Sequence, residues 1–260
     1  MTDADIDATK APLLEHLMEL RERLIRALMA FLGAFILAFF FAKDIYNLLV
    51  VPYTIAVGPD ATLIYTAPQE YFFTQIKVAM FAAAFVSCPI VFGQVYAFVA
   101  PGLYKHERAA FRPYLFATPI FFALGALVVY FLVMPNLLHF FISMQQANEP
   151  GKARIELLPR VSEYLSLIMT LVLAFGVVFQ LPVVLTLLGQ IGIVSSQFLA
   201  EKRRYAIVLV FIVAAVLTPP DVFSQLALAI PGLLLYEASI ISVRWIEKKR
   251  AAVEEQQAAG

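Results

Sequence analysis

The stretch YLSLIMTLVLAFGVVFQLPVVLTLL, residues 164–188, contains no charged side chain. A helix needs about 20 mostly apolar residues to cross the hydrocarbon of a bilayer. Lipid offers no hydrogen bonds to an exposed backbone, so a segment of this kind crosses the membrane as a helix. The stretch therefore predicts an integral membrane protein.

Five further apolar segments on either side of this stretch predict an all-α, polytopic fold. The six expected spans are residues 24–42, 76–100, 113–134, 164–188, 205–218 and 223–243. The fifth has about 14 residues and reaches about 21 Å of a hydrocarbon core near 30 Å thick, so local thinning of the bilayer is expected. Composition agrees, since 62% of the residues are hydrophobic and only 15% are charged.

The spans predict a single transmembrane domain over residues 1–245. An amphipathic helix on the cytoplasmic side is expected over residues 12–23, and a flexible cytoplasmic tail over 246–260. Prolines inside the spans favour kinks, because each removes a backbone donor. Kinked helices predict a concave, cup-like bundle. The interior prolines are Pro89, Pro119, Pro182 and Pro231.

Orientation follows from the basic residues, because cytoplasmic segments near helix ends retain Lys and Arg. Thirteen of the nineteen lie in the two tails and the second and fourth loops, and four lie in the first and third loops. Both termini are therefore predicted to be cytoplasmic. The first 23 residues lack the apolar core of a cleavable signal peptide, so the N-terminus is expected to be retained.

Several activities find no support in the sequence. A net charge of zero gives no field to attract nucleic acid, and no phosphate-binding Gly-x-x-x-x-Gly-Lys-Ser/Thr loop occurs. The three histidines are too scattered for a metal site, and no Gly-x-Ser-x-Gly elbow is present. Cys88 is the single cysteine and is expected to pack as a small apolar residue. We expect neither an enzyme nor a cofactor, and an external energy source is implied.

Two acidic residues on the predicted cytoplasmic face allow two interpretations. Glu19 lies on the amphipathic helix, where Glu19 with Arg23 and Glu22 with Arg26 could simply stabilise an interfacial helix. Glu107 lies in a compact charged loop that could simply be solvated. In the functional interpretation, both carboxylates bind a basic peptide, preferably through arginine, whose planar fork donates two parallel hydrogen bonds.

Polar residues within or beside the spans also leave alternatives open. Gln180 could form an interhelical hydrogen bond or have a direct functional role, and Glu237 could snorkel or pair with a partner helix. Asp221 lies just before the sixth expected span. This place favours a role as the N-cap of that helix over a contact with substrate.

Four separated stretches resemble the TatC family, the multispanning receptor subunit of the twin-arginine protein translocase. The resemblance runs from about residue 12 to about residue 245 in matching order and spacing. The stretches are HLMELR at 16–21, APGLYKHER at 100–108, AFGVVFQLP at 174–182 and LTPPDVFSQ at 217–225.

The resemblance implies a receptor in the bacterial inner membrane that binds twin-arginine signal peptides of folded precursor proteins. It further implies single-span partners TatA and TatB, self-association in the receptor complex, contact with membrane lipid, and transport driven by the proton-motive force. By position it implies a signal-peptide site of Glu19, Arg21, Lys105, His106 and Glu107.

The resemblance also assigns periplasmic functional positions to Pro52 and Asp221. Gln180 matches an intramembrane position where some relatives have Glu, so a polar docking site is expected there without a titrating carboxylate. From pattern alone, one rival is a secondary transporter of a small solute, with Gln180 and Glu237 lining its path. Another rival is an anchor for a membrane enzyme complex.

Overall fold

The computed structural model describes residues 3–59, 61–99, 107–146, 153, 155–218 and 220–258. Within these ranges it gives no side-chain description for 3–15, 96, 99, 107–113 and 253–258. The described backbone is helical apart from its connections, with two isolated bridges, Ile64 with Arg160 and Gln146 with Ile155. The all-α class predicted from the sequence is confirmed.

The elements follow one another in a simple order. They are α1 Asp3–Phe40, α2 Ala42–Val57, α3 Glu70–Val99, α4 Glu107–Val128, the π-helix η2 Val129–Val133, α5 Met134–Ser143, α6 Val161–Val178, α7 Leu181–Gln190, α8 Ser196–Glu201, α9 Arg203–Leu217 and α10 Val222–Ala258.

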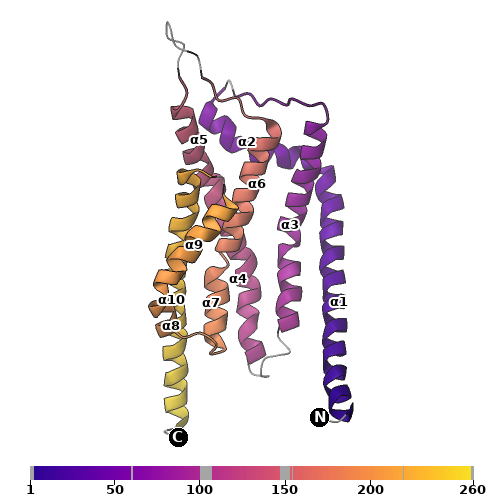
Figure 1. Ribbon diagram of the computed structural model, residues 1–260, viewed down its shortest axis with the longest axis vertical. Coiled ribbons are helices and arrows are strands. Elements are labelled where there is room, and N and C mark those ends of the chain that lie inside the picture. The colour runs from indigo at the N-terminus through magenta and orange to yellow at the C-terminus, as the bar shows by residue number, and fades with distance from the viewer. Residues whose placement is uncertain are drawn as a thin grey trace.

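The long helices form one bundle with α6 near its centre (Figure 1). Leu165, Ile168, Leu171 and Phe175 of α6 are fully buried, because helices on several sides cover this element. By contrast, α1 lies at the edge of the bundle and packs mainly along α3, so most of its apolar surface remains exposed. Exposed apolar helix faces of this extent suit a hydrocarbon solvent.

Among the described residues, five helical segments are long and apolar enough to cross a membrane. They are His16–Phe40, Glu70–Val95, Tyr114–Ser143, Val161–Gln190 and Val222–Ala252. The remaining apolar helix, α9, has 15 residues and is too short to qualify. The start of α1 and the end of α10 lie at the same end of the bundle (Figure 1), as an even number of passes requires. The count of six spans stays a prediction.

The first part of the chain differs from expectation in two ways. The amphipathic segment 12–23 and the first span are one continuous helix, α1. The segment after the first expected span contains the 16-residue helix α2. This helix was missed because its apolar run is interrupted by Lys43, Asp44 and Pro52.

The later spans also differ in their boundaries. The third continues from α4 through η2 into α5 and ends at Ser143 rather than at residue 134. The fourth is broken at Phe179 and Gln180, between α6 and α7, because Pro182 has no N–H to donate to the carbonyl of Val178 and its ring clashes with that carbonyl in a continuous helix. The last helix continues to Ala258 through the residues expected to form a flexible tail. There, Ser196 donates hydrogen bonds from its backbone N–H and its hydroxyl to Glu247.

Glycines let α4 and α6 approach closely at the centre of the bundle. A Cβ placed on Gly125 would lie 2.8 Å from the carbonyl oxygen of Phe175, and one on Gly176 would lie 2.5 Å from the ring of Phe122. Small residues at such crossings permit the close packing that drives helix association in lipid.

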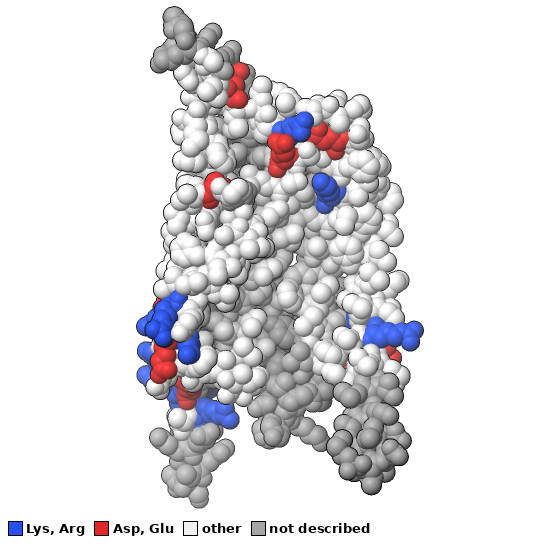
Figure 2. Space-filling model, viewed as in Figure 1, with Lys and Arg blue, Asp and Glu red and all other residues white. Residues whose placement is uncertain are grey.

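Charged residues gather towards the two ends of the bundle in Figure 2, with a mostly uncharged band between them. This distribution fits a protein whose middle is surrounded by hydrocarbon.

Candidate recognition site

Glu19 lies on α1, the helix that starts at the end of the bundle where both chain ends lie (Figure 1). Arg23, one turn further on, donates from Nε to Glu19 Oε1 at 3.0 Å, and its Nη2 reaches the same oxygen. Both side chains are partly covered, with exposed fractions of 32% for Glu19 and 20% for Arg23. The expected pair therefore forms, and it shows that this carboxylate can bind a guanidinium group.

The same turn of α1 is fixed against α3. His16 stacks on Phe98 with ring centroids 4.3 Å apart, and its Nδ1 lies 3.8 Å from Glu19 Oε2. Because Phe98 lies next to the end of α3 at Val99, this turn of α1 lies beside the end of α3.

The other residues of the predicted peptide site are only partly covered by the structure. Arg21 is exposed on α1. Lys105 and His106 lie outside the described residues, and only the backbone of Glu107 is described. The grouping of all five residues in one site stays a prediction.

A second pair, Glu22 with Arg26, also forms as expected. Arg26 Nη2 lies 3.3 Å from Glu22 Oε2, and both side chains are about two-thirds exposed. This pair has the same spacing as Glu19 with Arg23 but no comparable cover. The Glu22–Arg26 pair therefore serves as an exposed control for the partly covered Glu19–Arg23 pair.

Glu237 is paired within the chain. Arg203 at the start of α9 donates from Nε to Glu237 Oε1 at 2.7 Å and from Nη2 to Oε2 at 2.8 Å. The hydrogen bonds and negative charge of Glu237 raise the pKa of the Arg203 guanidinium. This two-bond contact joins α9 to α10. Of the two alternatives for Glu237, snorkelling or pairing with another helix, the structure has the pairing.

Gln180 lies at the break between α6 and α7 and is 7% exposed. Its backbone N–H bonds to Val177, three residues back, so the carbonyl of Gly176 loses the usual helical donor. Gln180 Nε2 donates to that carbonyl and to the carbonyl of Thr118 on α4, both at 3.2 Å. The interhelical hydrogen bond, one of the two alternatives left open by the sequence, is therefore present. Within the described structure, Gln180 Oε1 is buried without a hydrogen-bond donor.

Asp221 is the N-cap of α10. Its Oδ1 accepts a hydrogen bond of 2.7 Å from the backbone N–H of Ser224, which confirms the preferred interpretation.

Pro52 lies inside α2 and is buried. Because proline has no N–H, the carbonyl of Leu48 lacks its helical donor. Tyr130 of the π-helix η2 donates its hydroxyl to that carbonyl at 2.8 Å, and Tyr164 of α6 donates to the next carbonyl, Leu49, at 2.9 Å. Pro52 therefore leaves the Leu48 carbonyl available to Tyr130, and this hydrogen bond holds α2 against the bundle. Pro52 thus has a structural role.

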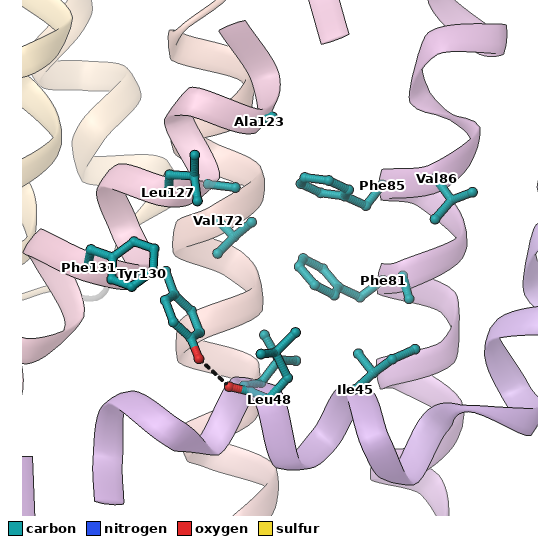
Figure 3. Close-up of a pocket in the computed structure, with 13 residues that line it drawn as sticks. Ile45, Leu48, Phe81, Phe85, Val86, Ala123, Leu127, Tyr130, Phe131 and Val172 are labelled. Atoms are coloured by element: carbon teal, nitrogen blue, oxygen red, sulfur yellow. Dashed lines mark hydrogen bonds between the residues drawn. The ribbon is translucent and has the colours of Figure 1, made fainter. Parts of the chain in front are cut away.

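A cavity of about 570 Å³ lies beneath α2. Figure 3 shows Phe81, Phe85, Leu127, Tyr130 and Phe131 around it, with the Tyr130 to Leu48 hydrogen bond at its edge. The side chains that line it are aliphatic or aromatic. Sequence reasoning missed this cavity, because α2 and the π-helix that shape it were not predicted.

Glu70 was also missed. Its Oε1 accepts from the Ser162 hydroxyl at 2.7 Å, and its Oε2 accepts from the Thr66 N–H at 2.9 Å. Beside it, the Ile64 N–H donates to the Pro159 carbonyl, and the Val161 N–H donates to the Ile64 carbonyl. The two long loops at this end are therefore joined. The sequence feature that could have identified Glu70 is its place as an acidic residue in the first turn of an apolar helix.

Together these features define a class of protein. A bundle with five membrane-length helices carries a carboxylate able to bind guanidinium at one end. In the part of the chain that the structure describes, no group of three His, Cys, Asp or Glu residues could hold a metal ion. The class is a polytopic membrane protein.

Comparison with known proteins gives the family. The family described as Sec-independent protein translocase protein (TatC) matches residues 15–231. A TatC of Magnetococcus marinus is 49% identical over 250 residues, covering 96% of this chain and 89% of the relative. The Escherichia coli K12 protein is 39% identical, covering 94% and 92%. A crystal structure of the twin-arginine translocase receptor TatC superposes with a TM-score of 0.77 at 37% identity, covering 89% of this chain and 99% of that one.

This chain belongs to the TatC family of Sec-independent protein translocases. The resemblance found in the sequence is confirmed. The assignment does not support the alternative of a small-solute transporter.

Proposed function

We propose that this chain is the signal-peptide receptor and core scaffold of a twin-arginine translocase. In this proposal Glu19 and Glu107 bind the two arginines of the signal peptide. Family membership supports the role, and so does the likeness to a solved protein described as the twin-arginine translocase receptor.

The contact between Arg23 and Glu19 carries the proposal. A carboxylate that already accepts from Nε and Nη2 of one arginine has the chemistry to accept another. Its partial cover lowers the effective dielectric and strengthens such a bond relative to a fully solvated glutamate. Lysine lacks the planar fork, so the site would prefer arginine.

Binding of a labelled twin-arginine peptide to the purified protein in a mild detergent tests the proposal. Glu19→Gln or Glu107→Gln should each weaken binding by about 1.5–3 kcal/mol, the range for hydrogen bonds to charged groups. Glu22→Gln is the matched control and should change binding by less than about 0.5 kcal/mol.

Double-mutant cycles assign each contact. Pairing each receptor variant with an arginine-to-glutamine change in the peptide should give a coupling of about 1 kcal/mol or more for the correct arginine. Additive losses in every cycle, with a correctly folded receptor, would place recognition elsewhere.

The assembly and its setting form the finer part of the proposal. Both termini face the cytoplasm, the protein lies in the bacterial inner membrane, and the proton-motive force drives transport. TatA and TatB bind as single-span partners, with the short helix α9 as the docking position, and copies of the chain associate in the receptor complex. The short apolar length of α9 supports this docking edge, because lipid fits such a surface poorly.

A further inference from the structure

A groove of about 370 Å³ lies between α1, α3 and α6, separate from the peptide site. Its polar members are Lys77 of α3 with Ser166 and Thr170 of α6. The rest of its lining is mostly apolar. These residues are Phe31, Met80, Phe81, Ala84, Met169 and Leu173.

The polar and apolar parts occupy different depths. Lys77 lies seven residues into α3 and Ser166 five residues into α6, which places them about 10 Å and 8 Å from the helix starts. Ala84 and Leu173 lie two turns deeper on the same helices. The groove therefore has a cationic and hydroxyl-bearing mouth near the end of the bundle that carries α2, and an apolar floor towards the membrane centre.

The positive charge at the mouth has no counter-charge in the described part of the chain. The two nearest acids along α3 and α6 are already engaged. Glu70 accepts hydrogen bonds from Thr66 and Ser162, and Glu163 lies 3.5 Å from Arg160. Lys77 itself makes no ion pair or hydrogen bond with a described residue.

The two hydroxyls are also available. Other helical hydroxyls bond back to the carbonyl four residues earlier, as Thr74 of α3 does to Glu70 and Ser239 of α10 does to Leu235. Neither Ser166 nor Thr170 makes such a bond within the described residues. Lys77, Ser166 and Thr170 thus line one groove, and none of them donates a hydrogen bond to another described residue.

We propose that this groove binds one anionic phospholipid from the adjacent leaflet. Its phosphate contacts Lys77 and the hydroxyls of Ser166 and Thr170, and an acyl chain lies along Phe81 and Leu173. A lysine near a helix end snorkels towards the headgroup level, and basic pockets between spanning helices suit lipid phosphates. A zwitterionic lipid brings a cationic group beside its phosphate, which offsets part of the attraction to Lys77, so charge favours the lipid whose headgroup is net anionic.

Native mass spectrometry of the full-length protein tests the site. Protein from mild detergent is incubated with dioleoyl phosphatidylglycerol or dioleoyl phosphatidylcholine, which share the same acyl chains. The wild type should retain one phosphatidylglycerol in preference to phosphatidylcholine. Lys77→Gln should lower that preference roughly fivefold, the factor expected for one basic residue near a lipid surface.

Three further variants separate this site from general attraction to anions. Lys43→Gln removes an exposed lysine of α2 that does not line the groove and should leave retention unchanged. Thr170→Phe fills the hollow from an exposed position and should reduce retention of both lipids. Lys77→Arg keeps the charge and should retain the preference.

Equal effects of Lys77→Gln and Lys43→Gln, or no headgroup preference in the wild type, would overturn the proposal. Undiminished retention in a folded Thr170→Phe protein would also overturn it. Helical content and elution volume establish that each variant is folded.

Discussion

Replacing Arg23 by glutamine should tighten binding of a twin-arginine peptide. Arg23 occupies Glu19 Oε1 in the structure, so a peptide arginine that binds there must displace it. Without Arg23, the Glu19 carboxylate is available, and a peptide arginine no longer competes with Arg23 for it.

The magnitude follows from the environment of the pair. An exposed ion pair one turn apart contributes about 0.3–0.5 kcal/mol, and measured exposed pairs range up to about 1 kcal/mol. Glu19 and Arg23 are only 32% and 20% exposed, which places them towards the upper part of that range. Losing this competitor, worth about 0.5–1 kcal/mol, should raise peptide affinity roughly twofold to fivefold.

Fluorescence anisotropy of a labelled peptide measures the change at fixed ionic strength, since salt screens exposed charges. Arg26→Gln removes the same charge from the exposed Glu22 pair and is the matched control, expected to leave affinity unchanged. In a Glu19→Gln background, Arg23→Gln should have no effect. Equal affinities for Arg23→Gln and Arg26→Gln, or weaker binding by a folded Arg23→Gln protein, would refute the competition.

Two further predictions concern packing and orientation. Gly125→Ala should destabilise the fold by about 1–3 kcal/mol in thermal unfolding, because its Cβ would meet the Phe175 backbone, whereas Gly93→Ala meets nothing within 4 Å and should not. A comparable stability of both variants would contradict the close crossing of α4 and α6. In whole cells, a membrane-impermeant thiol reagent should label Leu158→Cys and miss Ala251→Cys. The opposite labelling pattern would reverse the proposed orientation.

Some of the site could be read from local sequence. The pairing of Glu19 with Arg23 follows from a spacing of four on one helix, and the N-cap role of Asp221 follows from its place before an apolar run. Both depend on neighbours within one turn. The partner of Glu237 could not be read this way, because Arg203 lies 34 residues away on another helix.

The sequence by itself determined that this protein is a helical membrane protein, because the length and apolarity of a segment fix its free energy in lipid without reference to its neighbours. It also determined the family, through four motifs in order. Only the tertiary structure decided the hydrogen bond from Gln180 to Thr118, the helix α2 held by Tyr130, and the groove at Lys77. Each depends on a hydrogen bond or a hollow formed between helices distant in the chain, and hydropathy carries no information about which faces meet.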